Sequence, residues 1–164
     1  MSEKYILDGY NVIGKIPKLR EIKNNKGLAN SREALARMLA DIKYYRTSIE
    51  FVVVFDGKTG ELPSCSKTSL CGISCLFTKS GEEADDYIGI MLRNIRDKTG
   101  VVVISNDNKV YNKCKTYGVE ILQPSALQEL IKKQPRSANT DDKKISQQEA
   151  NDITKWYKEK LKGK

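Results

Sequence analysis

An α/β fold with a mostly parallel central sheet is predicted by two observations. First, short runs of β-branched and aromatic residues alternate along the chain with segments of helical periodicity, which is the pattern of successive β-α units. Second, the strongest of these runs are apolar on both faces, as strands are when helices cover both sides of a parallel sheet. A chain of 164 residues, 39% of them apolar, can bury one such core.

Five short strands are predicted, and an aspartate stands at the end of three of them. These three consist of residues 5–7, 51–55 and 101–104 and are strongly apolar. Residues 73–77 give a weaker strand pattern, and residues 119–122 predict a short final strand. The aspartates at the ends of the three apolar strands are Asp8, Asp56 and Asp107.

Helices are predicted where apolar residues recur three and four positions apart. The first is expected to begin near Asn30 or Ser31, where Asn30 and Glu33 offer a capping box. The other helices are expected over residues 82–98, over about ten residues after Asp107, and over residues 126–132 with Ser125 as the cap.

The segments between these elements define the domain organisation. Residues 15–30 and 58–71 are polar and contain Pro, Gly or Asn, so irregular connections are expected there. Residues 133–145 also lack apolar periodicity and predict a linker. The chain is therefore expected to contain one domain over residues 1–132 and a basic C-terminal helix over residues 146–164.

The net charge of +8 points to a polyanionic partner, and nucleic acid is the commonest case. Residues 132–164 hold ten Lys or Arg against five Asp or Glu, which fits either an electrostatic hold on a partner or a solvated chain end. No apolar run approaches the ~20 residues that span a bilayer, and no signal peptide is expected. A cytoplasmic protein with four reduced cysteines is therefore expected, since the cysteines form no CxxC pair.

The complete absence of histidine excludes several kinds of catalysis. Ser-His-Asp and Cys-His catalysis, histidine-based ribonuclease chemistry and most zinc hydrolase sites all need an imidazole. If the chain acts on nucleic acid as an enzyme, the remaining route is a set of carboxylates that holds Mg²⁺ or Mn²⁺.

The three strand-end aspartates can supply that set. In an open α/β sheet the ligand site lies beyond the carboxyl ends of the strands, so Asp8, Asp56 and Asp107 are expected to lie at one edge. Carboxylates gathered there repel one another unless a cation lies among them. The alternative is that each aspartate merely caps the helix that follows it.

The helix after residue 81 can supply a fourth acid. At 100° per residue, Asp85 lies at the border of the buried face, Asp86 points away from it, and Glu82 lies one turn before. Alternatively, these acids only complement the helix dipole. Asn11 could bind Asp8 or a phosphate, and Ser105 and Asn106 could orient water or metal, although each alone is more often structural.

These residues resemble a known family. Residues 6–14 (ILDGYNVIG) look like the opening of the YacP-like NYN domains, a branch of the PIN-like nuclease superfamily. The resemblance continues in the same order at residues 53–56 (VVFD), 77–88 (FTKSGEEADDYI) and 103–107 (VISND). The region of Trp156 is also similar to the C-terminal segment of that family, so the resemblance covers nearly the whole chain.

The resemblance implies a PIN-like three-layer α/β/α sandwich and metal-dependent cleavage of RNA in a bacterial cytoplasm. It matches Asp8, Asp85 and Asp107 to the acidic metal site, with Asp56 and Glu82 as supporting acids. Departures from the family pattern at residues 57–58, at Asn106 and at residues 125–129 concern substrate contacts more than the metal ligands. The matched polar and phosphate-binding positions are Asn11 and Arg32, although Arg32 is equally well explained as a surface residue.

A metal-dependent endoribonuclease is thus predicted, with Mg²⁺ or Mn²⁺ as cofactor and no small-molecule cofactor. Its substrate is expected to be RNA, mRNA in particular, with the ribosome as a candidate partner. The alternative is a non-catalytic RNA-binding module that has kept the fold, although none of the expected acids is missing. A flap-type DNA nuclease would need further helical elements, and a receiver domain would need an acidic pair near Asp8. The cations expected to grip the RNA backbone, besides Arg32, are Lys15, Lys18, Arg20, Lys23 and Lys26.

Overall fold

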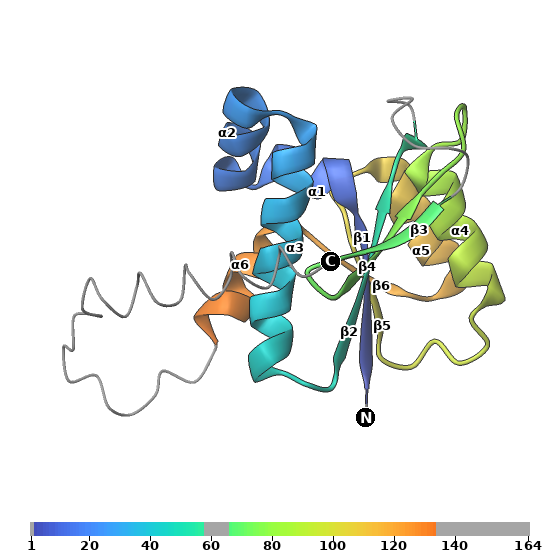
Figure 1. Cartoon of the computed structure of the whole chain (residues 1–164). Helices are drawn as coiled ribbons and strands as arrows, with labels where there is room; N and C mark the ends of the chain where they lie inside the picture. The colour runs from blue at the N-terminus through green and yellow to red at the C-terminus, as the bar shows by residue number, and fades with distance from the viewer. Residues whose placement is uncertain (1, 58–65, 134–164) are drawn as a thin grey trace. The chain divides into compact units, whose positions relative to one another are not determined.

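In the described part of the chain, six strands form one sheet in the order β3-β4-β2-β1-β5-β6 (Figure 1). The computed structural model describes residues 2–57 and 66–133. All neighbouring strands are parallel except β3, which pairs antiparallel with β4, so the predicted mostly parallel sheet is confirmed. The strands are β1 (Glu3–Asp8), β2 (Ile49–Phe55), β3 (Ser66–Leu70), β4 (Ile73–Phe77), β5 (Val101–Ile104) and β6 (Glu120–Leu122).

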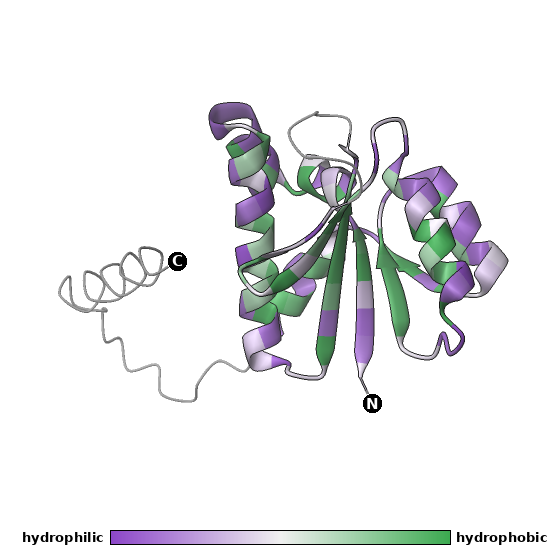
Figure 2. Ribbon diagram, turned by 45° about the vertical axis from the view of Figure 1, so that its right-hand side comes forward, coloured by the Kyte–Doolittle hydropathy of each residue, from purple (hydrophilic) through white to green (hydrophobic). Residues whose placement is uncertain are grey.

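Helices cover both faces of this sheet, which confirms the predicted three-layer sandwich. Helices α1, α2, α3 and α6 pack on one face, and α4 and α5 pack on the other. Figure 2 shows the hydrophobic strands of the sheet between the two helical layers. The helices in the described residues are α1 (Gly9–Lys15), α2 (Pro17–Lys26), α3 (Leu28–Tyr45), α4 (Ala84–Asn94), α5 (Asn108–Tyr117) and α6 (Ser125–Lys132).

The apolar runs of the sequence are explained by the two buried faces. In β1, Tyr5 and Leu7 belong to the core under α3, whereas Ile6 belongs to the core under α4. In β2, Val53 belongs to the core under α3 and Val54 to the core under α4. Because successive side chains of a strand point to opposite faces, a strand covered on both sides needs apolar residues at every position.

The chain changes direction across the sheet at β1. From β1 it passes through α1, α2 and α3 to β2 on one side of β1, and from β4 it passes through α4 to β5 on the other side. The helices of these two connections lie on opposite faces, so the carboxyl end of β1 is the switch point of the sheet, where α/β proteins commonly bind their ligands. Asp8, the last residue of β1, lies there.

The segment 15–30 is largely helical, so the expectation of an irregular connection was wrong. Pro17 is the first residue of α2, a position where its missing N–H costs nothing, and Leu19 is buried in the core. Gly27, with φ +88°, separates α2 from α3. The expected capping box is also absent, because Asn30 lies inside α3 and its side-chain amide donates to the Lys26 carbonyl at 2.7 Å.

Other differences concern where elements begin and end. Within the segment expected to be a loop, β3 forms through backbone pairing with β4, although its side chains are mostly exposed and polar. Helix α4 is shorter than the predicted span of residues 82–98. Helix α6 begins at Ser125 itself, and no side chain caps it. Apart from Lys133, the predicted linker and C-terminal helix lie outside the described residues.

The close packing of α1 on β2 predicts opposite effects for two glycine substitutions. A Cβ at Gly9 would overlap Cε1 of Phe55, whose ring is held between Tyr10 and Phe77. Gly9→Ala is expected to lower the free energy of unfolding by about 1–3 kcal/mol. Gly14→Ala, in the same helix with no atom within 4 Å, should raise it by up to about 1 kcal/mol. Urea denaturation measures both, and equal midpoints for the two variants would contradict this packing.

Candidate active site

Asp8 is a buried carboxyl group within electrostatic reach of three other acids. Only 8% of the residue is exposed, and the Ser105 hydroxyl donates to its Oδ2 at 3.3 Å. Burial raises the pKa of Asp8 to about 7, against the opposing effect of the Ser105 hydrogen bond. The negative charges of Asp56, Asp107 and Asp85 raise this pKa further. A carboxyl group in this environment gains stability from any cation that binds beside it.

Hydrogen bonds tie the end of β5 to the beginning of α1. The backbone N–H of Asn106 donates to Oδ1 of Asn11 at 2.7 Å, and the backbone N–H of Asp107 donates to Oγ of Ser105 at 3.1 Å. Of the three predicted supporting residues, Asn11 and Ser105 act through their side chains here. Asn106 contributes its backbone, and its side chain is exposed.

Asp107 caps helix α5, as the alternative interpretation expected, whereas Asp56 binds the first backbone N–H of α4 without being its N-cap residue. Asp107 Oδ1 accepts the backbone N–H of Lys109 at 2.7 Å at the beginning of α5. Asp56, at the end of β2, accepts the backbone N–H of Ala84 at the beginning of α4. A carboxylate has about four lone-pair sites, so these bonds leave each of the two groups able to bind a further ligand.

Asp85 is buried and Asp86 is exposed, as the helical geometry predicted. Lys113 on α5 reaches both acids, with its Nζ 3.3 Å from Oδ2 of Asp85 and 3.0 Å from Oδ1 of Asp86. Burial works to raise the pKa of Asp85, but the Lys113 charge and hydrogen bond outweigh it and hold that pKa below its usual value. Gly89 leaves room for the lysine, because a Cβ there would lie 3.1 Å from Cδ of Lys113.

A second acidic group is formed by the start of α4. Among the described residues, the set of three carboxylates whose oxygens lie within 4.8 Å of one another is Glu83, Asp85 and Asp86. The sequence had suggested Glu82 instead of Glu83, but the side chain of Glu82 is exposed. Its carbonyl accepts the Thr78 hydroxyl at 2.8 Å. Asp85 therefore belongs both to this group and to the acids that raise the pKa of Asp8.

Two lysines of α5 beside these acids were not anticipated from the sequence. Lys113 binds Asp85 and Asp86, and Lys109 lies 3.4 Å from the Glu83 carboxylate. The two lysines are four positions apart, so the helical period puts them on one side of α5. That spacing was visible in the sequence, but their partners depend on the packing of α5 against α4.

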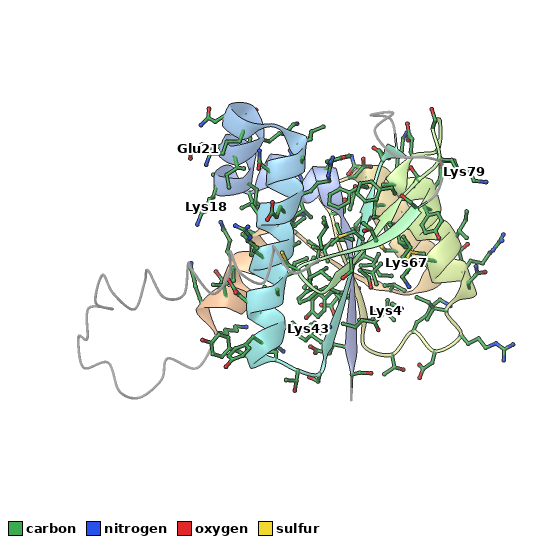
Figure 3. The ribbon with its side chains drawn as sticks, in the orientation of Figure 1. Lys4, Lys18, Glu21, Lys43, Lys67 and Lys79 are labelled. Atoms are coloured by element: carbon green, nitrogen blue, oxygen red, sulfur yellow. The ribbon has the colours of Figure 1, made fainter. Side chains whose placement is uncertain are left out.

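The predicted RNA-binding cations fall into two groups. Arg32 is 8% exposed, its guanidinium lies over the Phe77 ring at 5.6 Å, and its Nη1 donates to the Tyr10 hydroxyl at 2.9 Å. Arg32 is thus largely buried in the domain, in contact with Tyr10 and Phe77. Lys18 lies on the outer flank of α2 (Figure 3) and lines a hollow of about 380 Å³ with residues of α3 and α6. The exposed cations of α1 and α2 are Lys15, Lys18, Arg20, Lys23 and Lys26.

A family model described as the YacP-like NYN domain matches residues 5–164. The chain belongs to the YacP-like NYN domain family. This membership implies a nuclease-type domain, and it agrees with the strand-end acids described above. No helix in residues 2–57 and 66–133 is long and apolar enough to cross a membrane.

Proteins from Bacillus subtilis are similar to this family member. An uncharacterized protein YacP of strain 168 is 32% identical over 83 residues, which cover 51% of this chain and 47% of that protein. The match thus spans about half the length of that relative. A crystal structure of a tryptophan-to-leucine mutant of Rae1 (YacP) superposes with a TM-score of 0.61 at 25% identity over 79% of this chain and 75% of that one. Another Rae1 (YacP) crystal structure gives a TM-score of 0.60 at 24% identity over 99% and 86%, respectively.

The departure from the family pattern at Gly57 has a structural reason. A Cβ at this position would overlap the backbone oxygen of Thr78, so only glycine fits without a shift. The Gly57 N–H donates to Oγ1 of Thr78 at 3.0 Å. This contact joins the end of β2 to the residue after β4 and so helps to position Asp56.

The raised pKa of Asp8 predicts that stability depends on pH when no metal is present. An aspartate that ionises near pH 3.8 in the unfolded chain and near pH 7 in the folded protein does not lower the free energy of unfolding below about pH 4. The decrease in this free energy grows as the pH rises and reaches about 4 kcal/mol above pH 7. Asp8→Asn keeps an acceptor for Ser105 and removes the charge, so it should unfold like the parent at pH 4 but be the more stable protein at pH 8.

Urea denaturation in the presence of a chelator at several pH values measures this difference. Asp97→Asn is the control, because the pKa of the fully exposed Asp97 is lowered by hydrogen bonds from Thr99. This variant should gain no stability relative to the parent as the pH rises. A constant difference between Asp8→Asn and the parent from pH 4 to 8 would contradict the burial of an ionisable Asp8.

Proposed function

We propose that this protein is a divalent-metal-dependent endoribonuclease that hydrolyses phosphodiester bonds of RNA, mRNA in particular. The observation that carries the proposal is the position of Asp8, a buried carboxyl at the switch point of the sheet whose pKa is raised by burial and by three nearby acids. Such a concentration of negative charge is stable when a cation binds it. Membership of the YacP-like NYN family supports a nuclease.

The donor chemistry suits Mg²⁺ or Mn²⁺. Both ions prefer oxygen ligands, and the groups gathered at this edge are carboxylates. Asp8, Asp85 and Asp107 would hold the metal, with Asp56 and Glu82 acting through water. When bound, the metal would lower the pKa of a coordinated water and neutralise charge on the transferring phosphate.

The residues around the acids position them and attract the substrate. The Ser105 hydroxyl links the two acids, because it donates to Asp8 and accepts the backbone N–H of Asp107, while Asn11 accepts the neighbouring Asn106 N–H. Lys113 neutralises Asp85 while no metal is present. A metal ion bound to Asp85 would release the Lys113 ammonium group to bind a phosphate oxygen of the substrate. The exposed cations of α1 and α2 would attract the RNA backbone. The expected products carry 5′-phosphate and 3′-hydroxyl ends.

Cleavage of labelled RNA with Mg²⁺ or Mn²⁺ tests this proposal. Asp85→Asn should reduce the rate at least about 100-fold, because it removes a metal ligand. Asp97→Asn removes the same charge from a fully exposed site and should cut at the parent rate. The assay is run with and without translating ribosomes, so that a requirement for the ribosome appears as cleavage in one setting alone.

The same assay distinguishes the nuclease from the alternative, a non-catalytic RNA-binding module. An RNA-binding module with this fold would bind labelled RNA and leave it intact in both settings, with or without metal. Equal behaviour of the parent and Asp85→Asn in every setting would overturn the catalytic proposal. A chelator should abolish cleavage by the parent and leave its binding of RNA in place.

A further inference from the structure

A small pocket opens beside the strand-end acids, on the side of β5 and β6. Its volume is about 140 Å³, and its lining includes Ser105 and Asp107. Asp107 is also one of the acids that raise the pKa of Asp8, so the pocket and the proposed metal site share a residue. A group in the pocket would therefore lie next to whatever binds at the acids.

The lining of the pocket combines apolar, aromatic and polar side chains. Ile121 and Leu122 of β6 are half-buried and supply apolar surface. The Tyr111 ring, 51% exposed, stands on the α5 side. The side-chain amides of Asn106 and Gln123 are exposed and offer both donors and acceptors.

We propose that this pocket binds one nucleobase of the RNA, next to the phosphate that is cut. This inference rests on the proposed nuclease function and adds to it a binding site for one base of the substrate. A base has an apolar face that stacks on an aromatic ring and a polar edge that pairs with amides. Tyr111 would stack on the base, and Asn106 and Gln123 would bind its edge.

The composition of the lining favours a base over a phosphate. Within the described part of the chain, the lining contains no Lys or Arg, and its one charged residue, Asp107, is negative. A phosphate would be repelled there, whereas an uncharged base is not. Because bases of a duplex are stacked and paired, only an unpaired base can enter, so the RNA bound at this position is single-stranded.

Binding measured without cleavage tests the pocket independently of catalysis. The whole 164-residue chain carrying Asp85→Asn is titrated into a fluorescent single-stranded RNA and into an abasic strand of the same length. The RNA should bind about tenfold tighter than the abasic strand, because stacking of one base contributes ~1–3 kcal/mol. Adding Tyr111→Ala should remove most of this preference, and Tyr111→Phe should keep it.

A matched control separates stacking in the pocket from general surface contact. Tyr45→Ala removes a ring of similar exposure, 52%, from the end of α3, and it should keep the preference for the RNA. Unchanged preference in Tyr111→Ala, or no preference before it is introduced, would overturn the inference. Failure of the nuclease function would appear instead as absence of cleavage by the protein with Asp85 intact, whatever the outcome for Tyr111.

Discussion

The constraint on which the site depends is the burial of Asp8 among other acids. Burial and the nearby negative charges raise the pKa of Asp8 to about 7. Without a counter-charge, the ionised acids would therefore oppose folding. The protein offsets part of this cost with its own groups. Backbone N–H groups of two helices bind Asp107 and Asp56, and Lys113 neutralises Asp85. A metal ion bound at Asp8 would relieve the repulsion that remains.

The architecture explains why the acids meet. Strands β1, β2 and β5 run parallel, so their carboxyl ends lie at one edge of the sheet. The connections from β1 and from β4 leave on opposite faces, which makes this edge the switch point of the sheet. Two glycines permit the close contacts at this edge. Gly9 allows α1 to pack on Phe55, and Gly57 allows the end of β2 to meet Thr78. The site is thus held by rigid elements on both sides, which favours a fixed arrangement of its ligands.

Much of this arrangement could be predicted because it follows from simple periodicities. Parallel strands end at one edge, which brought Asp8 and Asp107 together in the prediction, and the helical period distinguished buried Asp85 from exposed Asp86. The roles of Glu83 and Lys113 could not be predicted, because they depend on how α4 and α5 pack. Helix α2 was missed because its proline and asparagines are usual turn residues, although Pro17 fits the first helical position. Strand β3 was missed because the backbone pairing of a polar strand leaves no apolar pattern.

The most direct test of the central claim is an anomalous difference map from crystals soaked with Mn²⁺. A peak with carboxylate oxygens of Asp8 and Asp85 among its ligands is the predicted result, and it should be absent from crystals of Asp8→Asn. A peak held by Glu83 and Asp86 without Asp8, or no peak near the strand ends, would contradict the claim that these buried acids form the metal site.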